Sequence, residues 1–105
     1  MNSPSAERRS VVWKYAVHPG AFALALPAGS EVLAVGHQHD GSVLWARIPF
    51  PPGSQMQTRS FRVVPTGDPF PDDGWCVFIG TWSIPDPLGT LWFHLFECQE
   101  ERPAR

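Results

Sequence analysis

Residues 31–48 contain two apolar runs, one on either side of Asp40-Gly41. An Asp-Gly pair between two alternating runs is among the strongest short-range signals for a β-hairpin. A two-residue type I′ turn then sets the register of the hairpin. It would pair His39 with Ser42, His37 with Leu44, Gly36 with Trp45, and Leu33 with Ile48.

The two faces of this hairpin differ in polarity, because side chains alternate along a strand. One face is apolar and is expected to face the core; it holds Leu33, Val35, Leu44, Ala46 and Ile48. The other is half polar and holds Val32, Ala34, Gly36, Gln38, Trp45 and Arg47. Since glycine has no side chain, Gly36 leaves space above the sheet, which Trp45 fills or shares with a partner.

Runs rich in β-branched and aromatic residues predict further strands. They cover residues 10–17, 21–26, 55–65, 75–84 and 90–98. The run 21–26 is short enough for a helical turn, but Pro27 and Gly29 end it quickly, which favours a strand. The last run is apolar on both faces, which predicts a central strand or one in a subunit interface.

The 12 prolines and 9 glycines stand between the apolar runs rather than in one tract. Residues 49–54 form a proline-rich loop that is not expected to join a central sheet ladder. Six or seven short strands at this spacing predict an all-β fold, a small barrel or sandwich of mainly antiparallel strands. We expect a single β domain over residues 10–98, with a flexible arm at 1–9 and a flexible tail at 99–105.

Charge and composition argue against two classes of protein, non-specific nucleic-acid binders and membrane-spanning proteins. Of the 105 residues, 43% are hydrophobic and only 17% are charged, and the net charge is −2. That charge argues against a non-specific nucleic-acid binder, and no apolar run reaches the roughly 18 residues of a membrane span. Low charge with abundant Trp and Phe predicts a homo-oligomer.

The two cysteines, Cys76 and Cys98, are too few for a disulfide framework. We expect two reduced, buried thiols in a cytoplasmic protein. A disulfide is geometrically possible if strands 75–84 and 90–98 are neighbours.

Metal binding and catalysis have few candidate residues. His37 and His39 share a strand face, so both could reach one metal with Asp40 or Cys76, although typical zinc spacings are absent. The alternative is a solvated hairpin tip. A thiol nucleophile would need Cys76 or Cys98 with His94, but their apolar flanks do not favour a reactive thiol.

Other reactive patterns are equally weak. There is no Gly-x-Ser-x-Gly elbow around Ser42, Ser60 or Ser83. Asp72-Asp73 is expected to form a turn rather than an acid/base pair. We expect no enzyme activity and no cofactor.

Arginines and aromatic residues form the more suggestive set. Arginine offers a planar fork of donors for phosphate or carboxylate, and an aromatic ring offers a base or sugar a stacking surface. The candidate ligand-binding residues are Arg47, Arg59, Arg62, Trp13, Trp45 and His94, with Tyr15 near them. Alternatively, the arginines are surface residues whose stems cover tryptophan, and His94 is a hydrogen-bonded core histidine.

Six segments, in order along nearly the whole chain, resemble a family of small uncharacterised phage-encoded proteins. They are VWKY (12–15), LPAGSEVLAV (26–35), LWA (44–46), TRSFRVVPTGDPFP (58–71), FIGT (78–81) and LWFHLFE (91–97). The resemblance implies a phage gene product that acts in the bacterial cytoplasm, and it supplies no catalytic motif.

These observations favour a non-enzymatic phage-type binding protein with an anti-defence role. It would sequester a small anionic nucleotide-like ligand or cap a host defence protein, with no membrane or non-specific nucleic-acid partner. The alternatives are a virion structural or assembly accessory and a small metal-dependent or thiol hydrolase.

Overall fold

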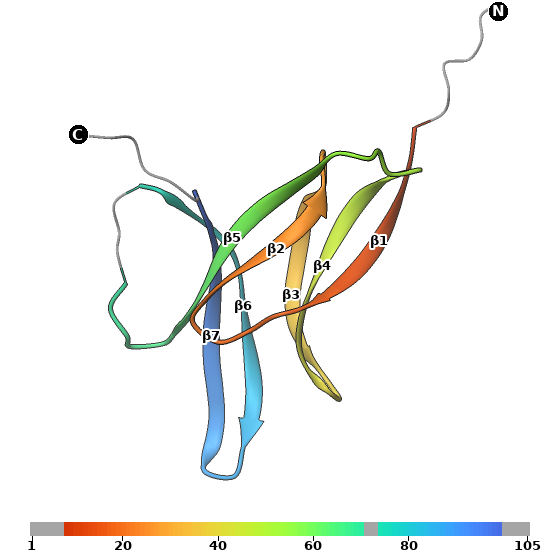
Figure 1. Ribbon diagram of the computed structural model, residues 1–105. Coiled ribbons are helices and arrows are strands. Elements are labelled where there is room, and N and C mark those ends of the chain that lie inside the picture. Colours follow the sequence, from red (N-terminus) through yellow and green to blue (C-terminus); the bar gives the residue numbers. More distant parts are fainter. Residues whose placement is uncertain (1–7, 71–73, 100–105) are drawn as a thin grey trace, which may run out of the picture.

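The computed structural model describes residues 8–70 and 74–99, which form seven strands and no helix (Figure 1). The strands are β1 Arg9–Ala16, β2 Ala21–Pro27, β3 Glu31–Gln38, β4 Gly41–Phe50, β5 Met56–Pro65, β6 Cys76–Asp86 and β7 Gly89–Cys98. Every strand pairing is antiparallel, which confirms the predicted all-β class. Within the described residues no helix is long and apolar enough to cross a bilayer.

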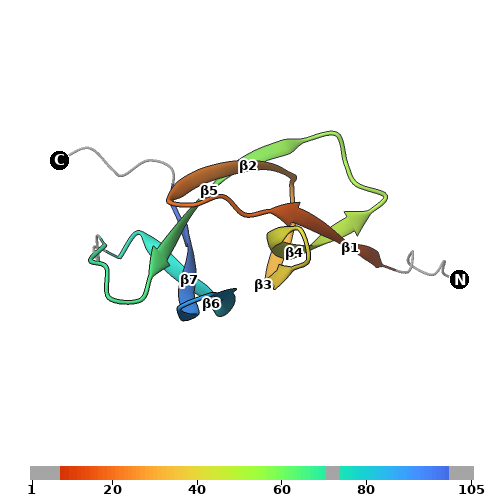
Figure 2. The same cartoon turned by 90° about the horizontal axis from the view of Figure 1, so that it is seen from below.

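The strands form two sheets with the architecture of a sandwich. One sheet has the order β1-β4-β3 and the other the order β2-β5-β7-β6. Seen from below, β3 and β6 lie beside each other where the two sheets approach (Figure 2). Strand β7 has a neighbour on each side, so the prediction that the doubly apolar last strand is central is confirmed.

The inward faces of both sheets supply the core. Its largest fully buried side chains are Leu26, Leu44, Ile48, Phe61 and Leu95. Full burial of such a side chain is worth about 1.5–3 kcal/mol, so this short list supplies much of the driving force for folding. The prediction that Leu44, Ala46 and Ile48 face the core is confirmed.

The β3–β4 turn lies one residue earlier than the predicted one. The structure pairs Gln38 with Gly41, so His39 and Asp40 form the turn. A type I′ turn needs two residues with positive φ, and here Gly41 alone has one, at +137°. The predicted pairs are therefore wrong: His37 lies opposite Ser42 and Gly36 opposite Val43.

A bulge in β3 also overturns one predicted core residue. The register shifts between Val32 and Ala34, so Val32 pairs with Ala46 and packs against the core. Leu33 is turned outward and is 45% exposed. One extra residue in a strand reverses the faces of all residues beyond it, and the sequence pattern contains no signal for it.

Pro49 belongs to a strand, contrary to the prediction of a loop from residue 49. It lies near the end of β4 opposite Ser10 of β1. The β3 pairing has already ended at Arg47, so β4 has a neighbour on only one side there. Proline is tolerated at such an edge position because no second strand needs its missing N–H.

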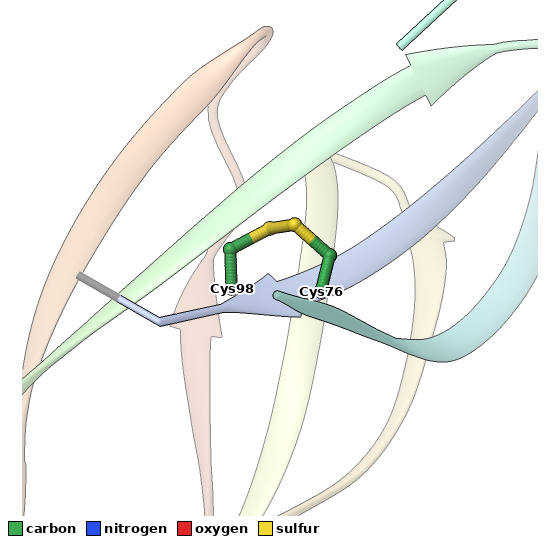
Figure 3. The surroundings of a disulfide bond; sticks show 2 residues. All are labelled: Cys76 and Cys98. Carbon is green, nitrogen blue, oxygen red and sulfur yellow. A yellow bond between two sulfur atoms is a disulfide. The ribbon is translucent and has the colours of Figure 1, made fainter. Parts of the chain in front are cut away.

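The cysteines are joined in a disulfide, so the prediction of two reduced thiols is wrong. Cys76 opens β6 and Cys98 closes β7, and the register places them directly opposite each other (Figure 3). Their Cα atoms are 3.9 Å apart, within reach of a covalent bridge. The two cysteines meet because β6 and β7 pair along the whole hairpin. Their spacing in the sequence does not by itself show that they are opposite each other.

Reduction of this disulfide should destabilise the fold without abolishing it. A bridge over 22 residues removes chain entropy from the unfolded state that corresponds to about 3 kcal/mol. We expect dithiothreitol to lower the free energy of unfolding by about that amount in urea titrations. The variant Cys76→Ala/Cys98→Ala should have the same free energy of unfolding as the reduced protein, and dithiothreitol should not change it. Equal stability of oxidised and reduced protein would contradict this prediction.

Candidate functional site

The structure does not form the predicted arginine-lined cleft. Arg47 lies on the outer face of the three-stranded sheet, where it pairs across to Glu31. Arg59 shares the inward face of β5 with Phe61, whereas Arg62 points to the opposite, outward face. The three arginines therefore lie on three different surfaces.

Arg59 is a structural cation. Its Nε donates to Glu97 at 2.5 Å, one Nη donates to the same carboxylate at 3.0 Å, and the other donates to the Ser30 carbonyl at 2.7 Å. The Arg59 and Glu97 side chains are only 18% and 25% exposed. The hydrogen bonds to Glu97 raise the pKa of Arg59 despite the opposing effect of burial. These contacts use three of the five guanidinium N–H groups and join β5, β7 and the β2–β3 turn.

Arg47 lies in an open groove on a different side of the molecule. It forms an exposed ion pair with Glu31. With Arg8, Arg9 and Phe50 it lines a groove of about 740 Å³, where the Arg9 guanidinium lies 6.0 Å from the centre of the Phe50 ring. Arg8 and Arg9 are solvent-exposed, so water already satisfies them.

Neither Trp13 nor Trp45 lines a cleft with an arginine. Trp45 lies over Gly36 on the outer face of its sheet, because a Cβ on Gly36 would meet the indole at 3.3 Å. It therefore fills the space that Gly36 leaves. Trp13 lies opposite Ala46 on the edge strand β1 and is half exposed.

Both ring nitrogens of His94 lie within hydrogen-bond distance of a threonine hydroxyl. Its Nε2 and the Thr66 Oγ1 are 2.7 Å apart, and its Nδ1 and the Thr81 Oγ1 are 2.9 Å apart. A hydroxyl can donate to or accept from an imidazole nitrogen, so both nitrogens are occupied whichever one carries the proton. The hydrogen-bonded alternative for His94 fits this geometry.

Arg62 differs from the other arginines because part of its guanidinium is buried without a partner. Its Nε has no hydrogen-bond partner among the described residues. It lies in register with Ala21 on β2 and Phe96 on β7. Leaving a buried donor unpaired costs about 1–3 kcal/mol, and more for a charged group.

A cavity of about 320 Å³, here called the Arg62 pocket, lies beside this guanidinium. Its walls come from the β1–β2 connection, the end of β5 with the following loop, and β7. They include Pro19, Gly20, Arg62, Asp68, Phe70 and Phe93. In the described part of the chain no ion pair joins Asp68 to Arg62. The pocket thus combines a cation that forms no ion pair with a described residue, one carboxylate and two aromatic rings.

A smaller apolar pocket of about 160 Å³ adjoins it, and the two share Pro19, Val63 and Phe93. Trp82 forms part of this second pocket and donates its indole N–H to the Ser42 hydroxyl at 2.9 Å. That bond joins β6 to β4 across the sandwich. The remaining lining is mostly hydrocarbon, so it suits an apolar group of a ligand anchored at Arg62.

The groups proposed for nucleophilic and metal chemistry do not assemble. Both cysteines are consumed by the disulfide, which removes the thiol nucleophile and the Cys76 metal ligand. His37, His39 and Asp40 are exposed at the hairpin tip. Across residues 8–70 and 74–99, no three His, Cys, Asp or Glu side chains gather as a metal site. Asp72-Asp73 lies outside the described residues.

A protein-family model, described as Domain of unknown function (DUF7352), matches residues 8–105. The chain belongs to this family. No curated protein and no solved structure matches it. The family description names no activity, so the case for a function of this DUF7352 member depends on its own side chains.

Sequence reasoning selected Arg62 but missed its surroundings. Asp68 and Phe70 come from a loop, where no periodicity indicates which way a side chain points. It also missed that Arg8, Arg9 and Phe50 meet at the groove. The Arg8-Arg9 pair before the first strand was a signal, but placing it near Phe50 required knowing that β1 pairs with β4.

Replacement of Arg59 and of Arg62 by methionine should have opposite effects on stability. Arg59→Met leaves Glu97 largely buried and unpaired, so we expect a loss of about 2–4 kcal/mol in the free energy of unfolding. Arg62→Met removes an unpaired buried donor, so we expect no loss, or a gain of up to about 1 kcal/mol. Urea titration measures both. Equal losses would show that Arg62 is a structural residue like Arg59.

Proposed function

We propose that this DUF7352 protein is a non-enzymatic, phage-type binding protein that acts against a host defence by sequestering a small anionic nucleotide-like ligand. The observation that carries the proposal is a pocket with aromatic walls that is lined by Arg62, an arginine that pairs with no carboxylate among the described residues. Arg47 and Arg59, by contrast, already have carboxylate partners.

The chemistry of the Arg62 pocket favours a phosphate or carboxylate joined to a ring. An ionised oxygen accepts a charge-assisted hydrogen bond from a guanidinium N–H, and such bonds are about twice as strong as neutral ones. Partial burial strengthens the attraction because less water screens it. Phe70 and Phe93 line the same cavity and suit a flat apolar group. The pocket is open and has a volume of about 320 Å³, so it can hold the phosphate and one ring of a larger ligand.

Ligand binding should depend on Arg62 and not on Arg47. We expect isothermal titration calorimetry to detect binding of at least one member of a panel of inorganic phosphate, AMP, a cyclic dinucleotide and ADP-ribose. Arg62→Gln should weaken that binding about 10- to 100-fold, because this change in affinity corresponds to the free energy of one charge-assisted hydrogen bond. Arg47→Gln is the matched control and should change it less than about twofold.

Two results would reject the proposal. If no member of the panel binds, the protein is not a sequestering protein for this ligand class. If Arg9→Gln abolishes binding and Arg62→Gln does not, the anion binds in the exposed arginine groove instead, and the Arg62 pocket is not the site.

The proposal includes action in the bacterial cytoplasm, as the phage resemblance implies. Disulfides persist mainly in oxidising compartments, so activity there requires that ligand binding not depend on the Cys76–Cys98 bond. Neither cysteine lines the Arg62 pocket. We expect the same affinity, within about twofold, with and without dithiothreitol, provided that the protein stays folded. Loss of binding from reduced but folded protein would place the site of action in an oxidising compartment.

A further inference from the structure

The outer face of the β6–β7 hairpin has aromatic residues on both sides of a polar row. Three successive cross-strand rows are Phe78 with Phe96, Thr81 with His94, and Ser83 with Trp92. Phe78 and Trp92 are 55% and 51% exposed. Phe96 is covered by Phe70, with ring centres 4.7 Å apart, and Phe78 packs edge-on against it.

This hairpin is almost free of charge. Residues 76–98 contain two carboxylates, Asp86 and Glu97, and no Lys or Arg. Both carboxylates are used within the chain: Asp86 accepts a hydrogen bond from the Leu88 amide, and Glu97 pairs with Arg59. A water-facing sheet surface is ordinarily polar, whereas exposed aromatic residues without charge are typical of an interface.

The polar row in the middle can be covered at little cost. Both ring nitrogens of His94 already have hydroxyl partners, Thr66 and Thr81. Burial of a polar group is costly chiefly when it loses water without gaining a hydrogen bond. A partner that covers this row therefore leaves no imidazole nitrogen unsatisfied.

The face of the hairpin is a better contact surface than its edge. β6 is an edge strand of its sheet. A register shift between Phe78 and Gly80 and the exposed Pro85 interrupt it, and both features hinder the addition of another strand. In the view of Figure 1 the hairpin extends beyond the tip of β3–β4, so it projects from the sandwich.

We propose that this face packs against the same face of a second copy of the chain, about a twofold axis near Thr81. A twofold axis brings identical patches together. Aromatic residues lie one row to each side of the Thr81–His94 row, so a twofold axis along that row places the row of Phe78 and Phe96 over Ser83 and Trp92 of the partner subunit. A face without charge suits a copy of itself because no like charges meet across the axis.

The expected dimer is small and reversible. Two strands of about ten residues, at spacings of about 4.8 Å and 3.3 Å, present a face of about 300 Å². Stable complexes bury about 800 Å² on each partner. The dimer should therefore be weak, with a dissociation constant of about 100 µM, and its formation does not require a ligand at Arg62.

Sedimentation equilibrium of the full chain tests this dimer. Between about 1 and about 200 µM, we expect the average mass to rise from 11.7 kDa toward twice that value. Phe78→Glu and Trp92→Glu should each keep the protein monomeric, because each buries a carboxylate in the contact. Val12→Glu is the matched control: Val12 is 56% exposed on the other sheet, and its variant should dimerise normally.

A covalent test locates the axis. Thr81→Cys should form an intermolecular disulfide under mild oxidation, since a residue near a twofold axis faces its own copy. The control His39→Cys, at the exposed β3–β4 tip, should not. A monomer at all concentrations overturns the proposal, as does a dimer that survives both Phe78→Glu and Trp92→Glu. Circular dichroism confirms that each variant is folded.

Discussion

The antiparallel pairing of β7 with β5 on one side and β6 on the other is the constraint on which most other features depend. It places Cys98 opposite Cys76, and it brings Glu97 within reach of Arg59. It also sets His94 between two threonine hydroxyls. A shift of one residue in this register would turn Leu95 out of the core and break these contacts together.

The arginines show how the surroundings of a residue, rather than its type, decide its role. Arg59 is held by a carboxylate and a carbonyl, so it stabilises the junction of the sheets. Arg47 has an exposed partner, which is worth little in water. Arg62 forms no ion pair with a described residue, so it is the arginine at which we propose that an anion binds.

The two proposals concern the same sheet but different parts of it. The Arg62 pocket lies where β5 ends beside the β1–β2 connection, whereas the proposed contact between copies is on β6–β7. Phe70 lies between them, since it lines the pocket and also stacks on Phe96. Phe70 is thus the residue at which the two surfaces meet.

The sequence by itself determined the all-β class, the approximate strands, the central place of the last strand and the burial of Leu44, Ala46 and Ile48. Those features follow from the alternation of apolar residues and from proline and glycine positions, which are local properties of the chain. It also selected Arg62 as a candidate, but together with Arg47 and Arg59, which have other roles.

Only the tertiary structure decided which residues meet. The bulge that exposes Leu33, the turn at His39-Asp40 and the Cys76–Cys98 bond depend on strand register, and a local pattern does not encode register between distant strands. The same holds for the burial of the Arg62 Nε, because the segments around it are far apart in the sequence. The residue types determine which interactions are chemically possible. The pairing of distant strands determines which of these interactions form.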